Sequence, residues 1–119
     1  MSVRTEKVAS LVKHELGVII QRNFGIDKYG FLTVTEVRMS PDLKIAKVYV
    51  SVFGDSNRKK QSMDLLEQEK SFLRSELGHH IRLKFTPSLF FYLDESLDRA
   101  MNINRILNQL HNDDSNENR

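Results

Sequence analysis

Residues 31–53 read FLTVTEVRMSPDLKIAKVYVSVF, and this stretch decides the fold. Residues 31–39 are rich in β-branched and apolar side chains, and in residues 44–53 apolar and polar side chains alternate. Alternation with a period of two is typical of a half-buried strand. Residues 40–42, with Pro41 to fix φ and polar neighbours that can bond to the local backbone, favour a turn. The stretch therefore predicts an antiparallel hairpin whose apolar face needs a cover.

Helical segments on both sides of the hairpin can provide this cover. Residues 3–24 predict an amphipathic helix, because apolar side chains recur at intervals of three and four. Its apolar stripe comprises Val8, Leu11, Val12, Leu16, Ile19 and Ile20. Gly17 lies in this helix and is expected to let another element approach closely.

A second helical region is predicted from residues 54–57, which can form a turn and supply an N-cap, to the helix-ending Gly78. Its apolar rhythm slips between Leu66 and Phe72, where all the side chains are polar. Two helices that meet at a bend near Ser71 would recover one apolar stripe.

The C-terminal third predicts one more strand and one more helix. Ile81, Leu83 and Phe85 alternate with polar residues, as in an extended segment. Residues 89–93 are strongly β-prone and predict a third strand that joins the hairpin. Residues 94–96 can start a last helix over residues 97–110, and the polar tail at residues 112–119 is expected to be disordered.

Composition sets broad limits on function. The 119-residue chain carries 18 Lys and Arg against 16 Asp and Glu, a formal net charge of +2. The tail, residues 112–119, contains three of the acidic residues and one basic residue, which leaves +4 on residues 1–111. A mildly basic body suggests a polyanionic partner, and ordinary solubilising charge is the alternative.

The chain contains no cysteine, which excludes disulfides, thiol catalysis and zinc sites built on cysteine. The N-terminus lacks the apolar run of a signal peptide, and no apolar segment approaches the roughly 20 residues that span a bilayer. We expect a soluble, cytoplasmic protein with one domain over residues 1–111, a monomer with no membrane partner.

The predicted order is α-β-β-α-kink-α-β, with helices on one face of a three-stranded sheet. This α+β order is that of the KH type II domain, an RNA-binding fold in which a GxxG loop between the two middle helices clamps the nucleic-acid backbone. No two glycines in this sequence stand in that relation. The sequence therefore predicts a KH type II-like domain without its clamp.

Several short sequence words, in order and spacing, are similar to those of a known family. They are TEVRMS at 35–40, DL at 42–43, AKVYV at 46–50, FLRSELG at 72–78, IRL at 81–83, PSLFF at 87–91 and DES at 94–96. On these words the chain resembles the bacterial ribosome-binding factor A (RbfA) family over nearly its whole length. The resemblance implies a KH type II-like fold in which an interhelical kink replaces the GxxG loop.

The kink of the family usually carries Ala-x-Gly, and the aligned residues here are Glu69, Lys70 and Ser71. The resemblance also implies a role. Family members bind the small (30S) ribosomal subunit late in its assembly and support processing of precursor 16S rRNA, notably in the cold. The implied partner is thus the small subunit, through its 16S rRNA and neighbouring ribosomal proteins.

With this role, basic side chains become candidate phosphate contacts, because RNA affinity in such proteins comes largely from Lys and Arg. The alternative for each is a solvated or intramolecular charge. The candidate RNA-binding residues are Arg4, Lys7, Arg22, Arg38, Lys44, Arg74, Arg82 and Lys84, with Lys59 and Lys60 as weaker candidates. Tyr49, Phe90 and Tyr92 could stack on bases, although packing in the core or on the sheet is the preferred interpretation.

The remaining polar residues give no sign of catalysis, a metal site or a cofactor. His79 and His80 are adjacent on a predicted extended segment, so their side chains would point to opposite sides. His14 and His111 have no evident partners. Asp42 and Asp94 fall at predicted turns, where capping is the expected role.

Three functions stay open from the sequence. The leading one is a non-catalytic assembly factor that docks a basic face on immature rRNA. The second is a ribonuclease that acts on precursor rRNA, supported only by histidine near basic residues. The third is a protein-binding α+β module that does not touch RNA.

Overall fold

The computed structural model describes residues 2–23, 32–96, 99 and 107. Most of the predicted last helix and the polar tail at residues 112–119 lie outside the described residues. Nothing in the described part separates residues 1–111 from the tail as a domain, so that boundary stays a prediction.

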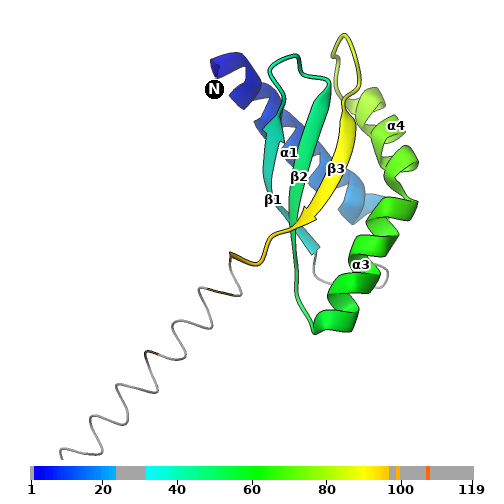
Figure 1. The fold of residues 1–119 in the computed structure, drawn as a ribbon. Helices are drawn as coiled ribbons and strands as arrows, with labels where there is room; N and C mark the ends of the chain where they lie inside the picture. Colours follow the sequence, from blue (N-terminus) through cyan, green and yellow to red (C-terminus); the bar gives the residue numbers. More distant parts are fainter. Residues whose placement is uncertain (1, 24–31, 97–98, 100–106, 108–119) are drawn as a thin grey trace, which may run out of the picture.

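Three helices and three strands make up the described part (Figure 1). In chain order they are α1 (Val3–Asn23), β1 (Leu32–Met39), β2 (Ile45–Val52), α3 (Ser56–Gln68), α4 (Lys70–His80) and β3 (Ser88–Leu93). The strand order is β1-β2-β3, with β1 and β2 antiparallel and β2 and β3 parallel. The helices lie on one side of this sheet (Figure 1). The predicted α+β, KH type II-like order is confirmed.

The predicted hairpin forms, and its turn is built as the sequence suggested. The N–H of Leu43 donates to the carbonyl of Ser40 at 2.9 Å, and the Asp42 carboxylate accepts from the N–H of Lys44 at 3.1 Å. Leu43 has a positive φ of 63°, which is uncommon for a residue other than glycine. A β-bulge between Val34 and Glu36 shifts the register of the ladder.

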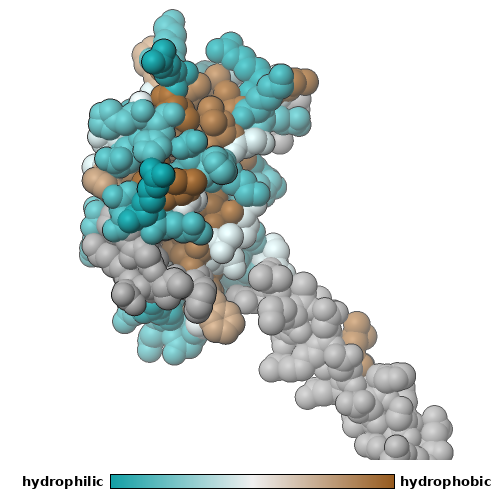
Figure 2. All heavy atoms as spheres, turned by 180° about the vertical axis from the view of Figure 1, so that it is seen from behind, coloured by the Kyte–Doolittle hydropathy of each residue, from teal (hydrophilic) through white to brown (hydrophobic). Residues whose placement is uncertain are grey.

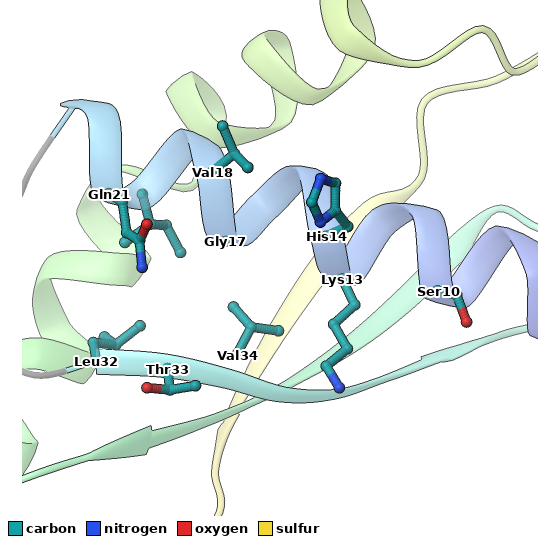
Figure 3. A pocket seen from close by; sticks show the side chains of 10 residues that line it. Ser10, Lys13, His14, Gly17, Val18, Gln21, Leu32, Thr33 and Val34 are labelled. Carbon is teal, nitrogen blue, oxygen red and sulfur yellow. The ribbon is translucent and has the colours of Figure 1, made fainter.

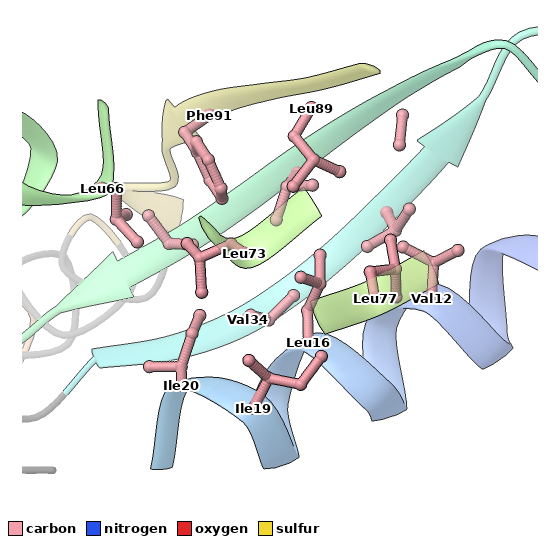
Figure 4. Packing of buried hydrophobic residues seen from close by; sticks show 14 of the residues in the cluster. Val12, Leu16, Ile19, Ile20, Val34, Leu66, Leu73, Leu77, Leu89 and Phe91 are labelled. Atoms are coloured by element: carbon pink, nitrogen blue, oxygen red, sulfur yellow. The ribbon is translucent and has the colours of Figure 1, made fainter. Parts of the chain in front are cut away.

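The core lies between the sheet and the helices (Figure 4). The alternating residues of β2 face it as predicted, with Ala46, Val48 and Val50 fully buried and Val52 2% exposed. From α1, Val12, Leu16 and Ile19 are fully buried, while Leu11 is 42% exposed, so its prediction as a core residue is wrong. Burial of each large apolar side chain contributes about 1.5–3 kcal/mol.

The predicted bend lies at Glu69, two residues before Ser71. Leu66 and Leu73 are fully buried. If one straight helix ran through both, residue 69 or 70 would lie between them on the buried face, and both of these side chains are charged. Glu69 instead takes φ −94° and ψ 6° and separates α3 from α4. The break therefore lets the two helices share one apolar stripe while these charges stay at the surface.

Gly78 does not end its helix, because α4 continues to His80. A Cβ on Gly78 would lie 2.8 Å from Oγ1 of Thr86. Glycine here allows residues 81–87 to pass close to α4 on their way to β3. It follows that His79 and His80 are helical, which corrects the prediction of an extended segment, and residues 81–87 form no strand.

Candidate nucleic-acid interface

Three segments meet at one end of the molecule: the N-terminus of α1, the turn between β1 and β2, and residues 81–87 (Figure 1). They bring together Arg4, Lys44 and Lys84, which we call the cationic end, around the ring of Phe85. Arg4, Lys84 and Phe85 line a hollow of about 220 Å³ together with residues of the turn. Three of the predicted RNA-binding residues, far apart in sequence, thus lie at one site.

Phe85 organises the charges at this end. Its ring is 53% exposed, and the Nζ atoms of Lys44 and Lys84 lie 5.3 and 5.6 Å from its centroid. Each cation–π contact at an exposed site contributes about 0.5–1 kcal/mol and leaves the ammonium charge in place. Within the described part of the chain, neither ammonium group is in a salt bridge. Both remain able to bind an anion.

One carboxylate lines the same hollow. The side-chain oxygen of Asp42 accepts from the Ser40 hydroxyl at 2.6 Å and from the N–H of Lys44. These two hydrogen bonds lower the pKa of Asp42. The capping role that the sequence predicted for Asp42 is confirmed, and its charge is committed to holding the turn that carries Lys44.

Arg74 contacts the segment that carries Lys84 and Phe85. Its Nη2 donates to the carbonyl of Thr86 at 2.8 Å and its Nε donates to the carbonyl of Pro87 at 3.2 Å. These two hydrogen bonds from one guanidinium, the Arg74 fork, fix the end of the segment that carries Lys84 and Phe85. The structure therefore gives Arg74 an intramolecular positioning contact, which is the alternative that the sequence left open, and its contact with RNA stays a prediction.

The other predicted contacts are spread over the molecule. Arg38 pairs with Glu36 at 2.9 Å on the sheet face that the helices leave open. Arg22 lies in the last turn of α1, about 27 Å along the helix from Arg4. Lys7 and Arg82 are exposed. Of the kink residues, Lys70 pairs with Glu67 at 3.0 Å and reaches the ring of Phe90, while Ser71 is exposed in α4.

Phe85 is the functional candidate that sequence reasoning missed. Its alternation with Ile81 and Leu83 predicted an extended segment and gave Phe85 no role of its own, whereas the side chain is exposed and contacts two cations. The signal lay in the neighbours, because Lys84 precedes Phe85 and Thr86-Pro87 ends any strand there. A charged residue on one side of Phe85 and the end of the extended segment on the other both favour an exposed position for its ring.

The predicted aromatic trio also lies at the surface. Phe90 and Tyr92 are each 42% exposed, and Tyr49 is half-buried. Packing on the sheet is confirmed by the stacking of Tyr49 against Tyr92, with ring centroids 5.4 Å apart. Packing of these rings in the core is wrong, because the alternate residues of β2 and β3 fill the core instead.

His80 contacts two carboxylates. His80 Nδ1 lies 3.0 Å from Oε2 of Glu15, and its Nε2 lies 3.8 Å from Oε2 of Glu76, which ties α4 to α1. Among the residues that the structure describes, no three His, Cys, Asp or Glu side chains come together as a metal site would need. Asp94 has the expected capping role, since it accepts from the N–H of Ser96 at 2.9 Å.

A separate hollow of about 530 Å³ lies between α1 and β1 (Figure 3). Lys13, His14 and Gln21 line it from the helix, and Thr33 and Val34 line it from the strand. Gly17 faces this space, and a Cβ there would meet nothing within 4 Å. The prediction that Gly17 permits a close approach is therefore wrong.

The helix side of the molecule is mainly hydrophilic, with hydrophobic atoms in the gaps between polar side chains (Figure 2). In the described ranges, none of the helices combines the length and the apolar character that crossing a bilayer requires.

Fold and site together define an α+β domain of KH type II order that lacks the GxxG loop and carries a cationic end. A family model described as "Ribosome-binding factor A" matches residues 4–107. The chain belongs to the ribosome-binding factor A family.

Solved structures of the family are similar to this chain. The crystal structure of ribosome-binding factor A from Thermus thermophilus is 24% identical, with a TM-score of 0.65, over 75% of this chain and 94% of that one. A solution NMR structure of a candidate ribosome binding factor A from Thermotoga maritima is 28% identical, with a TM-score of 0.69, over 81% and 92%. A Thermus thermophilus RbfA homology model fitted into a cryo-EM map of a 30S–RbfA complex is 25% identical, with a TM-score of 0.62, over 73% and 91%.

Proposed function

We propose that this protein is a non-catalytic assembly factor that binds the small ribosomal subunit as a monomer and contacts 16S rRNA during late maturation. In this role it supports processing of precursor 16S rRNA, including growth in the cold, and works in the cytoplasm. Membership of the family and the 30S complex of its Thermus thermophilus relative support the choice of partner.

The observation that carries the proposal is the cationic end. Phosphate contacts need cations that are exposed, close together and not neutralised by carboxylates. Lys84 meets this description, because Phe85 holds it without cancelling its charge. Lys44 is held by the same ring and meets it in part, because the Asp42 carboxylate in the same hollow interacts with its charge. Arg4 adds a guanidinium on the wall of the same hollow, and such groups bind phosphate oxygens in a bidentate way.

The absence of a GxxG loop shapes how specificity is achieved. Without a clamp on four nucleotides, sequence readout of a single strand at the kink is not available. We infer that the protein recognises the shape of folded rRNA and the context of the subunit. A protein bound mainly through phosphates can also be released when the RNA rearranges.

Sedimentation of a cell lysate tests the proposal. The protein should travel with free small subunits and be absent from translating ribosomes, as expected for a factor that leaves before initiation. A protein found only at the top of the gradient at low salt would contradict the proposal. Precursor 16S rRNA should accumulate when the gene is deleted, most strongly at low temperature, and normal processing at all temperatures would contradict the maturation role.

A further inference from the structure

Aromatic rings and cations gather on the sheet face opposite the helices. The side chains that alternate with the core residues of the strands point to this side, which we call the open face. They include Glu36, Arg38, Ile45, Lys47, Tyr49, Phe90 and Tyr92. The helices cover only the other side of the sheet (Figure 1). In the part of the chain that the structure describes, this row of rings is thus left without a covering layer.

The first half of the open face is a stack across the strands. Tyr49 and Tyr92 are direct partners in the β2–β3 register, and their rings stack with centroids 5.4 Å apart and an angle of 28° between planes. The guanidinium of Arg38 from β1 lies 5.5 Å from the centroid of Tyr49. The stack holds the rings in place, and Tyr92 at its end is 42% exposed.

The second half of the open face is centred on Phe90, two residues before Tyr92 in β3. Phe90 shares the face of Tyr92, about 6.6 Å away along the strand. Phe90 is 42% exposed, and Nζ of Lys70, the first residue of α4, lies 5.3 Å from the centroid of its ring. Lys47 is the register partner of Phe90 on β2. The kink therefore places a cation over the open face as well as separating two helices.

The charges of this face are largely paired. Glu36 binds Arg38, Glu67 binds Lys70, and Asp94 accepts a hydrogen bond from Thr35 at 2.7 Å. Among the described residues, Lys47 is in no salt bridge. A face with exposed rings and little free charge suits flat, partly apolar groups better than phosphates. Nucleobases are such groups, and they stack on aromatic rings whatever their sequence.

We propose that the open face is a stacking platform for single-stranded RNA, with one unpaired base on Tyr92 and the next on Phe90. That the ligand is RNA rests on the proposed function, whereas the assignment of a stacking surface rests on the geometry of the rings. Lys47, the register partner of Phe90 and in no salt bridge among the described residues, would contact a linking phosphate. The platform would thus add base-dependent binding to the phosphate contacts of the cationic end.

The experiment compares two oligomers of about 12 residues, oligouridine and an abasic ribose phosphate of equal length, by fluorescence anisotropy. The test variants are Tyr92→Leu and Phe90→Leu, which keep an apolar side chain but remove the ring. Tyr92→Phe and Phe90→Tyr are matched controls that keep a ring. Each test variant should weaken oligouridine binding about 5- to 100-fold and leave abasic binding unchanged. The controls should stay within about twofold of wild type.

Both rings are exposed, so the variants are expected to fold, and equal melting temperatures check this directly. Equal wild-type affinity for the two oligomers, or Leu variants that bind oligouridine like wild type, would overturn the platform. If wild type also co-sediments with small subunits, the proposed function stands without the platform. Base-dependent binding in a protein that does not co-sediment would support the platform and contradict the proposed function.

Discussion

At the scale of single residues, Gly78 and Thr86 decide how closely the approach to β3 passes the last helix. Alanine at position 78 has two opposing effects. It raises helix propensity by about 1 kcal/mol, and its Cβ would lie 2.8 Å from Oγ1 of Thr86. Overpacking of this kind costs about 1–3 kcal/mol.

We therefore expect Gly78→Ala to lower the free energy of unfolding by about 1 kcal/mol in the wild-type background. In a Thr86→Ala background, the hydroxyl nearest to the new Cβ is gone, and the same change should raise stability by about 1 kcal/mol. Urea unfolding of the four proteins measures both effects. Effects of equal sign and size in the two backgrounds would show that Gly78 and Thr86 are not coupled.

Asp94 is a second residue with a testable role, because its lowered pKa makes stability depend on pH. Hydrogen bonds from Ser96 and from the Thr35 hydroxyl lower its pKa to about 2 from the usual 3.8. A carboxyl with a lowered pKa in the folded state stabilises the fold above its unfolded pKa, and this contribution is lost as pH falls through the folded pKa. The contribution should thus be complete at pH 5 and above, which is about one pH unit above the pKa of Asp94 in the unfolded chain.

Asp94→Asn should consequently destabilise the protein at neutral pH, and the difference from wild type should shrink as pH falls from about 4 towards 2. Chemical unfolding of both proteins at several pH values provides the measurement. A difference that does not change with pH would mean that the charge of Asp94 plays no part in stability.

At the scale of elements, the segment at residues 81–87 has no regular structure, and Arg74 holds it in place. Its fork to the carbonyls of Thr86 and Pro87 precedes the first rung of β3, where the N–H of Ser88 donates to the carbonyl of Lys44 at 2.8 Å. Loss of the fork should loosen both the segment and this rung.

We expect Arg74→Ala and Arg74→Lys to increase hydrogen exchange at residues 81–88 by a similar factor, about fivefold, because a lysine cannot bridge two carbonyls with a planar fork. Exchange in α1 should not change. Full protection in the lysine variant would show that positive charge alone, and not the fork, fixes the segment.

The same scale shows what the sequence could and could not predict. Alternation in β2 and the spacing of three and four residues from Leu16 to Ile19 and Ile20 predicted the sheet and α1, because both patterns follow directly from burial on one face. The helix end at Gly78 was wrong because that glycine serves a contact with Thr86, which lies beyond the helix. The place of Phe85 was missed for a similar reason, since its partner Lys44 lies on another element.

The candidate site could be predicted in composition but not in arrangement. Basic residues of the right kind were identified, yet nothing local distinguishes Arg4, which lies at the cationic end, from Arg22, about 27 Å away on the same helix. Only the way in which α1, the turn and residues 81–87 meet makes that distinction.

At the scale of the whole molecule, two surfaces of different chemistry are proposed to contact RNA. At the cationic end, Lys44 and Lys84 are in no salt bridge among the described residues, and this end should bind phosphates in a salt-dependent way. The open face holds rings with paired charges and should bind bases with little dependence on salt. The helix side is mainly hydrophilic (Figure 2).

The central claim is that the cationic end provides the phosphate contacts. Its most direct test is the salt dependence of binding to purified small subunits, for wild type and for the triple variant Arg4→Gln, Lys44→Gln and Lys84→Gln. A second triple variant, Lys13→Gln, Arg58→Gln and Arg99→Gln, removes the same charge at residues that are not candidate phosphate contacts and serves as the control.

The slope of the logarithm of the binding constant against the logarithm of salt concentration should become shallower by about 1 for each lost phosphate contact, or about 3 for the first variant. It should change by less than about 1 for the control. Equal changes in the two variants, or no change in the first, would contradict the assignment of the phosphate contacts to Arg4, Lys44 and Lys84.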